Sequence, residues 1–561
     1  MAPEETSPAE EAGEPEPPQP KASASAGVAR SAGIASAAIF LSRITGLVRE
    51  SVMSGLFGAG ATMDAFNIGF RIPNLTRDLF AEGALSSAFV PTFTKYLTTK
   101  GKDEALELYN LVATGILLIV GTLTIAGMVF SPQLVELFAS SFHQIPGQFD
   151  LAVRLTRIMF PFLLVVALAA QAMGVLNACR QFGVPALSSV WFNVGSVAFG
   201  LIIGRWVGPH VGISRIEGMA YGVVIGGVLQ LLFQVPSLIR SGFRYWPAVQ
   251  LNHPGFRNVL RLMGPAILGN ASVQINVLVN SNFATGITDA TGHVMSGPVS
   301  WLAYAFRFMQ LPLGLFGVAI ASASLPAISR SAAQNDMPGF RDTLSHALTL
   351  VMLLTIPSAA GLAVLGESMI ALVYQHGAFT AYFTHQTAIA LTCYAVGLTG
   401  YAAVKILAPA FYALNDARTP MVVSMASVAI NFGVAFTMTR FLHLGHRGLA
   451  LSTSAVALFN FLILLFLIRR RIGGVEGGAL LRSFGKIMAA SLLLAAVCAS
   501  SNYWIRALAG AHLFGLLLTL SVSMVLGATA FYSACLLLKV PELEMAEAAI
   551  ARPLLRRLRI R

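Results

Sequence analysis

Arginine residues inside apolar segments are the clearest candidates for chemistry in this sequence. Arg77 and Arg307 lie well inside such segments, and another segment carries Arg43 within it and Arg49 at its end. A charged side chain in a bilayer costs about 2.5 to 3.5 kcal/mol on insertion scales, so it usually faces a water-filled cavity or a partner. Because the planar guanidinium group can hold two oxygens at once, these residues predict a cavity for an anionic phosphate or diphosphate ester.

The second apolar segment carries acidic as well as basic residues. On a helix, Arg71, Asp78 and Glu82 share one face, whereas Arg77 points about 120° away from them. We expect the first three to pair with one another, or Arg71 to reach the head groups from a span end. Arg77 is then left for a ligand.

A structural role competes with a cavity role at several polar positions. Arg43 and Glu50 are seven residues apart on one helical face, where they could pair with each other instead of lining a cavity. For Lys405 both roles are open. Arg307 has no acidic residue within a helical turn, which favours a role in binding.

Signatures of catalysis are missing from the sequence. It has no GxxxxGK[ST] phosphate loop, no HExxH pair, no GxSxG turn and no acidic pair with metal-ligand spacing. We therefore expect no catalytic residue, no cofactor and no bound nucleotide. A membrane enzyme acting on a polyprenyl phosphate is an open alternative, with Asp64, Asp78 and Glu82 as its only candidate carboxylates.

The composition is that of a polytopic membrane protein. Of 561 residues, 56% are hydrophobic and 11% are charged, and the mean hydropathy is +0.71. These values exclude a soluble enzyme, and the net charge of +12 is explained by basic cytoplasmic loops without nucleic acid. Since a crossing needs about 20 apolar residues, we predict about fourteen spans, near residues 31–48, 63–92, 107–131, 155–178, 184–204, 217–239, 259–282, 299–328, 344–366, 386–412, 419–440, 447–468, 484–505 and 513–538.

An internal repeat relates the two halves of the chain at an offset of roughly 230 to 240 residues. Three ordered matches carry it: Phe70-Arg71 with Phe306-Arg307, Asn193 with Asn431, and Gly218 with Gly448. An offset of six spans is even, so the halves are parallel and related by a pseudo-two-fold axis along the membrane normal. The prediction is an all-α fold of two six-helix lobes plus two extra C-terminal helices, with chance similarity among apolar helices as the alternative.

The predicted division of the chain follows from this repeat. Residues 1–29 form a disordered, acidic, proline-rich tail, 30–240 the N-terminal lobe, 241–470 the C-terminal lobe, 471–540 spans 13 and 14, and 541–561 a basic tail. Most Lys and Arg residues fall on the side of the two termini, which places both termini in the cytoplasm.

Residues 42 to 91 contain a block of specific motifs: Ser42-Arg43-Ile44-Thr45-Gly46-Leu47-Val48-Arg49-Glu50, then Asp64-Ala65-Phe66, and the run from Arg71 through Arg77 to Gly83 and Pro91. These motifs give the segment a close resemblance to the MurJ (MviN) family of lipid II flippases. It continues through Met263 to Gly269, Ser300 to Pro326 and Lys405 to Tyr412. The resemblance implies the fold of the multidrug/oligosaccharidyl-lipid/polysaccharide exporters, with a cationic cavity between two lobes and spans 13 and 14 forming a groove for the lipid tail.

The resemblance also implies roles for particular residues. Arg49, Arg77 and Arg307 hold the diphosphate, supported by polar residues at Arg43, Asp64, Asn74, Glu82, Gln310 and Lys405. Some relatives have acidic residues where this chain has Phe306 and Gln310. Some relatives bind sodium in the second lobe, where this chain offers only Asn270, Asn276, Asn431 and Asn460, so the coupling ion (sodium or proton) and any metal site stay open.

The implied function is to flip lipid II, an undecaprenyl-diphosphate-linked peptidoglycan precursor, from the cytoplasmic to the outer leaflet of a bacterial inner membrane. It would do so by alternating access, driven by membrane potential or an ion gradient, with lipid II, membrane lipids and peptidoglycan synthesis proteins as partners. The alternatives are an exporter of another anionic oligosaccharide-lipid or small molecule, and the membrane enzyme described above.

Overall fold

The computed structural model describes residues 22–79, 85–289, 291–474, 477–510 and 512–543. Within these ranges the chain is built from helices and their connections, and its only β-type pairing is one isolated bridge between Thr288 and Val294. The predicted all-α fold is therefore confirmed for the described part of the chain.

The first half of the chain forms a lobe in which α1 packs on α8, and α2 packs on α6 and α7. Its elements are α1 (Ala22–Phe57), α2 (Ala61–Arg77), α3 (Ser86–Thr99), α4 (Lys102–Val129), α5 (Ser131–Ala139), the 3-10 helix η2 (Ser140–Gln144), α6 (Gln148–Met159), α7 (Pro161–Ala178), α8 (Gly183–Ile202), the π-helix η3 (Ile203–Val207), α9 (Gly208–Val211) and α10 (Arg215–Arg240). The predicted lobe boundary at residue 30 falls inside α1.

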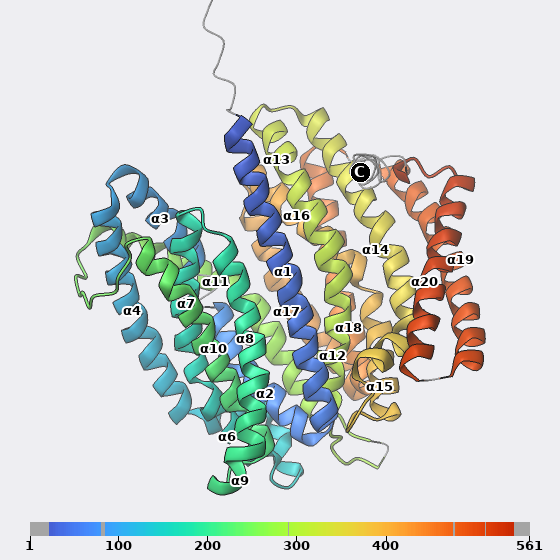
Figure 1. Ribbon diagram of the computed structural model, residues 1–561. Coiled ribbons are helices and arrows are strands. Elements are labelled where there is room, and N and C mark those ends of the chain that lie inside the picture. The colour runs from blue at the N-terminus through green and yellow to red at the C-terminus, as the bar shows by residue number, and fades with distance from the viewer. Residues whose placement is uncertain (1–21, 80–84, 290, 475–476, 511, 544–561) are drawn as a thin grey trace, which may run out of the picture.

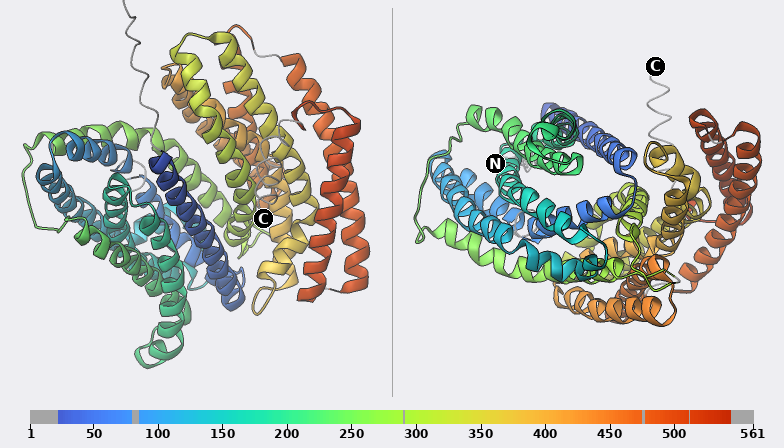
Figure 2. Two further views of the ribbon diagram at one scale, coloured as in Figure 1. Left: turned by 45° about the horizontal axis from the view of Figure 1, so that its top comes forward. Right: turned by 90° about the horizontal axis from the view of Figure 1, so that it is seen from below.

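The second half forms the other lobe, and two further helices flank it at the outer edge of the molecule (Figures 1 and 2). Its elements are α11 (Pro254–Thr285), α12 (Pro298–Pro312), the π-helix η4 (Leu313–Val318), α13 (Ala319–Ala333), α14 (Met337–Tyr374), α15 (Ala381–Ala395), α16 (Leu398–Ala413), α17 (Arg418–Phe436), the π-helix η5 (Thr437–Phe441) and α18 (Gly445–Arg471). The flanking helices α19 (Gly477–Ala509) and α20 (Leu513–Leu537) pack on each other and on α14.

In the described part of the chain, ten helical runs are long and apolar enough to cross a membrane, and two bent pairs raise the number to 12. The predicted spans 1 and 2, which correspond to α1 and to α2 with α3, are not among them. The chain is thus a multi-pass membrane protein, and the count of fourteen stays a prediction.

Equivalent residues of the two lobes have equivalent surroundings. Asn193 donates its amide to the Ser42 carbonyl of α1, the first helix of its lobe, and Asn431 donates to Asn280 of α11, the first helix of the other. The π-helices η3 and η5 interrupt the matched spans at corresponding positions. These features support the parallel repeat over chance similarity.

Span 10 is bent by 44° between α15 and α16. A Cβ atom at Gly397, which lies in the bend, would be 2.6 Å from the Ser454 backbone of α18. The Ser454 hydroxyl donates to the carbonyl oxygens of Cys393 and Tyr394 at 2.8 and 3.2 Å. The bend is stable in an apolar environment because a neighbouring side chain binds the carbonyl groups that it frees.

The connection between the lobes runs as an extended strap beside α4. The Trp246 backbone N–H donates to Asn110 Oδ1, and the Ala248 N–H donates to Thr114 Oγ1, both at 3.1 Å. Asn110 and Thr114 are buried polar residues of α4. Their side chains accept hydrogen bonds from backbone N–H groups of the strap, which lack the partners that a helix would provide.

Candidate functional site

A cavity of about 600 Å³ lies between the lobes. Residues of α1, α2, α8 and α10 line it from one lobe, and residues of α11, α12 and α15 to α18 line it from the other. Its polar lining combines arginine with neutral amide and hydroxyl groups: Arg49, Glu50, Asn67, Arg71, Asn74, Ser196, Ser272, Asn276, Asn280, Tyr304, Arg307, Gln310, Tyr394, Tyr401, Ser424, Ser427, Asn431, Thr453 and Asn460. With three arginines and one glutamate, this cavity suits a polar anion.

The Arg307 side chain crosses between the lobes to Glu50 of α1. Arg307 Nε donates to Glu50 Oε1 at 2.5 Å, and the Tyr374 hydroxyl donates to Glu50 Oε2 at 3.1 Å. Arg49 lies 4.0 Å from the same carboxylate and stacks over the Phe192 ring at 5.2 Å. One carboxylate therefore holds two arginines at the lobe interface, where a diphosphate could take its place.

The partner of Glu50 was not anticipated. The sequence suggested Arg43, but the guanidinium of Arg43 lies beside Gly314, where a Cβ atom would be 3.1 Å from its Nη2. Glu50 and Arg307 are 257 positions apart, so no helical periodicity could pair them. The only hint in the sequence that an acidic residue belongs to the arginine site was the position of Glu50 directly after Arg49.

The charges of span 2 pair differently from the prediction. Arg71 faces the cavity, where its Nη1 donates to Ser281 Oγ of α11 at 2.7 Å, so it neither pairs with Asp78 nor reaches the head groups. Arg77, which was expected to be left for a ligand, donates to Asp78 at 2.7 Å. The predicted pairing fails because Arg71 finds its partner in the other lobe, and because Arg77 is next to Asp78 in the sequence, within reach of its long side chain. Glu82 lies outside the described residues.

Asp64 holds the lobes together and does not line the cavity. Its Oδ2 accepts the Gly297 N–H at 2.6 Å, and its Oδ1 accepts the Ser300 N–H and hydroxyl at 2.8 and 2.6 Å. A carboxylate in this position caps the first turn of α12 and complements the positive end of its dipole. Asn67 adds a hydrogen bond to Ser300 at 3.0 Å.

Further contacts close the same end of the molecule. The Ala378 N–H donates to the Gly55 carbonyl at 2.7 Å, and the Ser51 hydroxyl donates to the Val373 carbonyl at 2.8 Å. These contacts, with those of Asp64, lie at the end opposite the start of α1 and the end of α20 (Figure 1). The lobes are thus joined on the side away from the termini.

Only some of the remaining predicted site residues line the cavity. Asn74 and Gln310 line the cavity, and Gln310 accepts a long hydrogen bond of 3.4 Å from Arg307. Arg43, Arg77 and Lys405 are not among its lining residues. Of the asparagines considered for sodium, Asn276, Asn431 and Asn460 line the cavity but Asn270 does not. The one carboxylate in the described lining, Glu50, is engaged by Arg307 and Tyr374.

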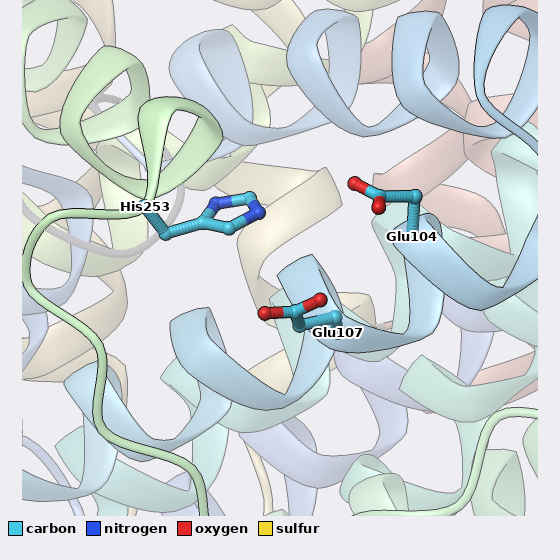
Figure 3. A group of neighbouring side chains, drawn as sticks. All are labelled: Glu104, Glu107 and His253. Atoms are coloured by element: carbon cyan, nitrogen blue, oxygen red, sulfur yellow. The ribbon is translucent and has the colours of Figure 1, made fainter.

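A second group of titratable side chains joins α4 to the start of α11. Ligand atoms of Glu104, Glu107 and His253 lie within 4.8 Å of one another (Figure 3). The His253 Nδ1 accepts the Phe256 N–H at 3.3 Å, so the neutral ring carries its proton on Nε2, the atom that points toward the carboxylates. The His253 ring therefore caps the start of α11 through Nδ1, and the three side chains lie close together where α4 meets α11.

Two helical lobes around a central polar cavity are the architecture of a membrane transporter. The family described as "Lipid II flippase MurJ" matches residues 53–522. The chain belongs to this family, whose members are transporters and not enzymes.

Individual relatives agree with this assignment. The chain is 34% identical over 476 residues to a protein of Burkholderia cenocepacia named "Lipid II flippase MurJ", covering 83% of this chain and 89% of the relative. It is 34% identical over 439 residues to a "Probable lipid II flippase MurJ" of Vibrio cholerae, covering 77% and 81%. These relatives are bacterial proteins of similar length.

Solved structures extend the comparison to the fold. A structure of "Lipid II flippase MurJ, inward closed conformation" matches with a TM-score of 0.73 at 27% identity, covering 92% of this chain and 99% of the other. An inward-facing multidrug transporter of the MATE family matches with a TM-score of 0.62 at 16% identity, covering 79% and 95%, which shows a shared fold alone.

Proposed function

We propose that this chain flips lipid II from the cytoplasmic to the outer leaflet of a bacterial inner membrane, for cell wall synthesis. The observation that carries the proposal is the cluster of Arg49, Arg71 and Arg307 in a cavity between two lobes, in a chain of the lipid II flippase family. Both termini are cytoplasmic in this proposal, as the distribution of Lys and Arg favours.

The arginines bind the diphosphate of the substrate. In the empty protein Glu50 neutralises Arg307 and keeps it extended toward the cavity. An incoming diphosphate offers several oxygens to the guanidinium forks and displaces the single carboxylate. The sugar and peptide part of the head group then faces the amides of Asn276, Asn431 and Asn460, which line the same cavity.

Transport follows from rocking one lobe against the other. The contacts of Asp64 and Gly55 close the side away from the termini, so substrate enters from the side of the termini and leaves when those contacts break. A membrane potential contributes about 2.3 kcal/mol per charge per 100 mV. An inside-negative potential therefore favours outward movement of the anionic head group, with no nucleotide required. We expect Arg77 to join the diphosphate contacts in another state of the cycle.

Replacing Arg307 with Ala tests the proposal directly. Loss of a charge-assisted contact to the diphosphate lowers transport by at least about tenfold, while the amount of protein in the membrane stays normal. The measurement is leaflet-resolved labelling of lipid II in cells that depend on this chain, with Arg440→Ala, an exposed position in η5, as the matched control. Undiminished outer-leaflet lipid II in the Arg307 variant would overturn the proposed role of the cavity.

Depletion of the protein separates the classes of function. Lysis with lipid II retained in the inner leaflet agrees with a flippase, and disappearance of the precursor itself would point to an enzyme. Intact cell walls with normal lipid II distribution would instead favour an exporter of another anionic molecule.

A further inference from the structure

A second large depression lies on the C-terminal lobe, away from the arginine cavity. It has a volume of about 860 Å³ and is formed by α14, α15, α16, α18 and α19, with no residue of α20 in its described lining. We call it the α18–α19 groove. Its lining is apolar except for Thr392, Thr399, Ser491 and Arg469. A lining of this kind and a volume in this range suit one lipid-sized ligand.

The groove and the arginine cavity share no lining residue. Tyr394 and Tyr401 face the cavity, whereas Val396 and Thr399 of the same bent span face the groove. Span 10 and α18 therefore form a wall between the two. A substrate whose diphosphate lies at Arg307 does not reach the groove through the lobe.

Arg469 supplies a cation at one end of the groove. Three arginines end α18, and two of them are engaged: Arg471 pairs with Asp416, and Arg470 stacks on Phe466 at 4.5 Å. Within the described part of the chain, the Arg469 guanidinium makes no hydrogen bond or ion pair. An unpaired guanidinium above an apolar groove complements an anionic head group.

The length of the groove fits one leaflet. Leu458 and Arg469 of α18 are eleven positions apart, which at a rise of 1.5 Å per position is about 16 Å, close to half of a hydrocarbon core of about 30 Å. We propose that the α18–α19 groove binds one anionic phospholipid of the leaflet on the side of the termini, with its phosphate at Arg469 and an acyl chain beside α19. This lipid is a resident of the protein, separate from the transported substrate.

Lipid retention by the purified full-length protein tests this proposal. The protein is reconstituted in nanodiscs of phosphatidylglycerol and phosphatidylethanolamine and extracted, and the lipid still bound is counted by native mass spectrometry. The unaltered protein retains phosphatidylglycerol, and Arg469→Gln lowers that retention by about fivefold, the loss expected for one basic residue near the surface. Ala363→Phe, which fills the groove, abolishes the retention.

The matched control is Arg482→Gln, an exposed arginine of α19 that donates to the Gly478 carbonyl and does not line the groove. Equal phosphatidylglycerol retention by the Arg469 and Arg482 variants would overturn the proposal. So would preferential retention of undecaprenyl diphosphate over phosphatidylglycerol, because the groove would then hold the substrate tail. The readout is binding, so it stays informative even if the chain does not flip lipid II.

Discussion

At the scale of single residues, the arginine cavity depends on one carboxylate. Glu50 is largely buried, contacts Arg307 from the other lobe and lies near Arg49. Without this carboxylate, the arginines would leave an excess of positive charge at the interface between the lobes, and burying unpaired charge there costs free energy. Glu50 therefore neutralises the empty cavity, and in the proposed function it occupies the position that the diphosphate takes.

Replacing Glu50 with Gln separates binding from transport. The variant keeps the size of the side chain but removes the charge that competes for Arg307, so we expect tighter binding of a diphosphate lipid, by up to about tenfold. We expect flipping to become slower, because the empty protein must return to its starting state while Arg307 has no carboxylate to neutralise its charge. Binding is measured by titration of undecaprenyl diphosphate and transport by leaflet-resolved labelling. Weaker binding by the variant would contradict the placeholder role of Glu50.

At the scale of elements, helix contacts in the N-terminal lobe depend on small residues. Gly218, Gly222 and Gly226 recur every fourth residue on α10, where a Cβ atom at Gly222 would be 2.3 Å from the Ser196 carbonyl of α8. Small residues let helix backbones approach closely in membranes, where apolar burial gives little drive for association. The spacing of these glycines positions α8 beside α10 and, through α8, positions α1 and its arginines.

A Gly222→Ala substitution tests this packing. The added methyl group meets backbone atoms that cannot move aside, so we expect a loss of about 1 to 3 kcal/mol of stability. Thermal unfolding in detergent measures the effect, and Gly433→Ala, where the space around the position is open and exposed, serves as the control. Equal melting temperatures for the two variants would show that α8 and α10 have room to separate.

The sequence predicts the elements better than their contacts. The apolar segments, the repeat and the cavity arginines Arg49 and Arg307 follow from local composition and spacing, because a membrane span needs a long apolar run. The pairing of Glu50 with Arg307 and the capping of α12 by Asp64 join residues more than 230 positions apart. Such contacts depend on how the two lobes pack against each other. The spacing of residues along one helix carries no information about that packing. Arg71 likewise finds its partner 210 positions away, at Ser281.

At the scale of the whole molecule, the two ends of the lobe interface differ. On the side away from the termini, the lobes are joined by backbone hydrogen bonds and by the buried Asp64 carboxylate. On the side of the termini, α11 and the strap connect the lobes through the contact of Asn258 with Thr92 and through the bonds of Asn110. In the proposed rocking mechanism the first set breaks for substrate to leave, whereas the second persists as a hinge.

A reversible cross-link across the closed end tests this mechanism. The side chains of Asn67 and Ser300 meet at 3.0 Å from opposite lobes, so cysteines at both positions, in a chain whose four native cysteines are replaced, should form a disulfide under mild oxidation. We expect the oxidised protein to keep binding a diphosphate lipid from the side of the termini but to lose flipping, since the far end cannot open. Reduction should restore flipping, and each single cysteine variant should be insensitive to oxidant. Full flipping by a quantitatively cross-linked protein would exclude opening between α2 and α12, and the substrate would then have to leave by another route.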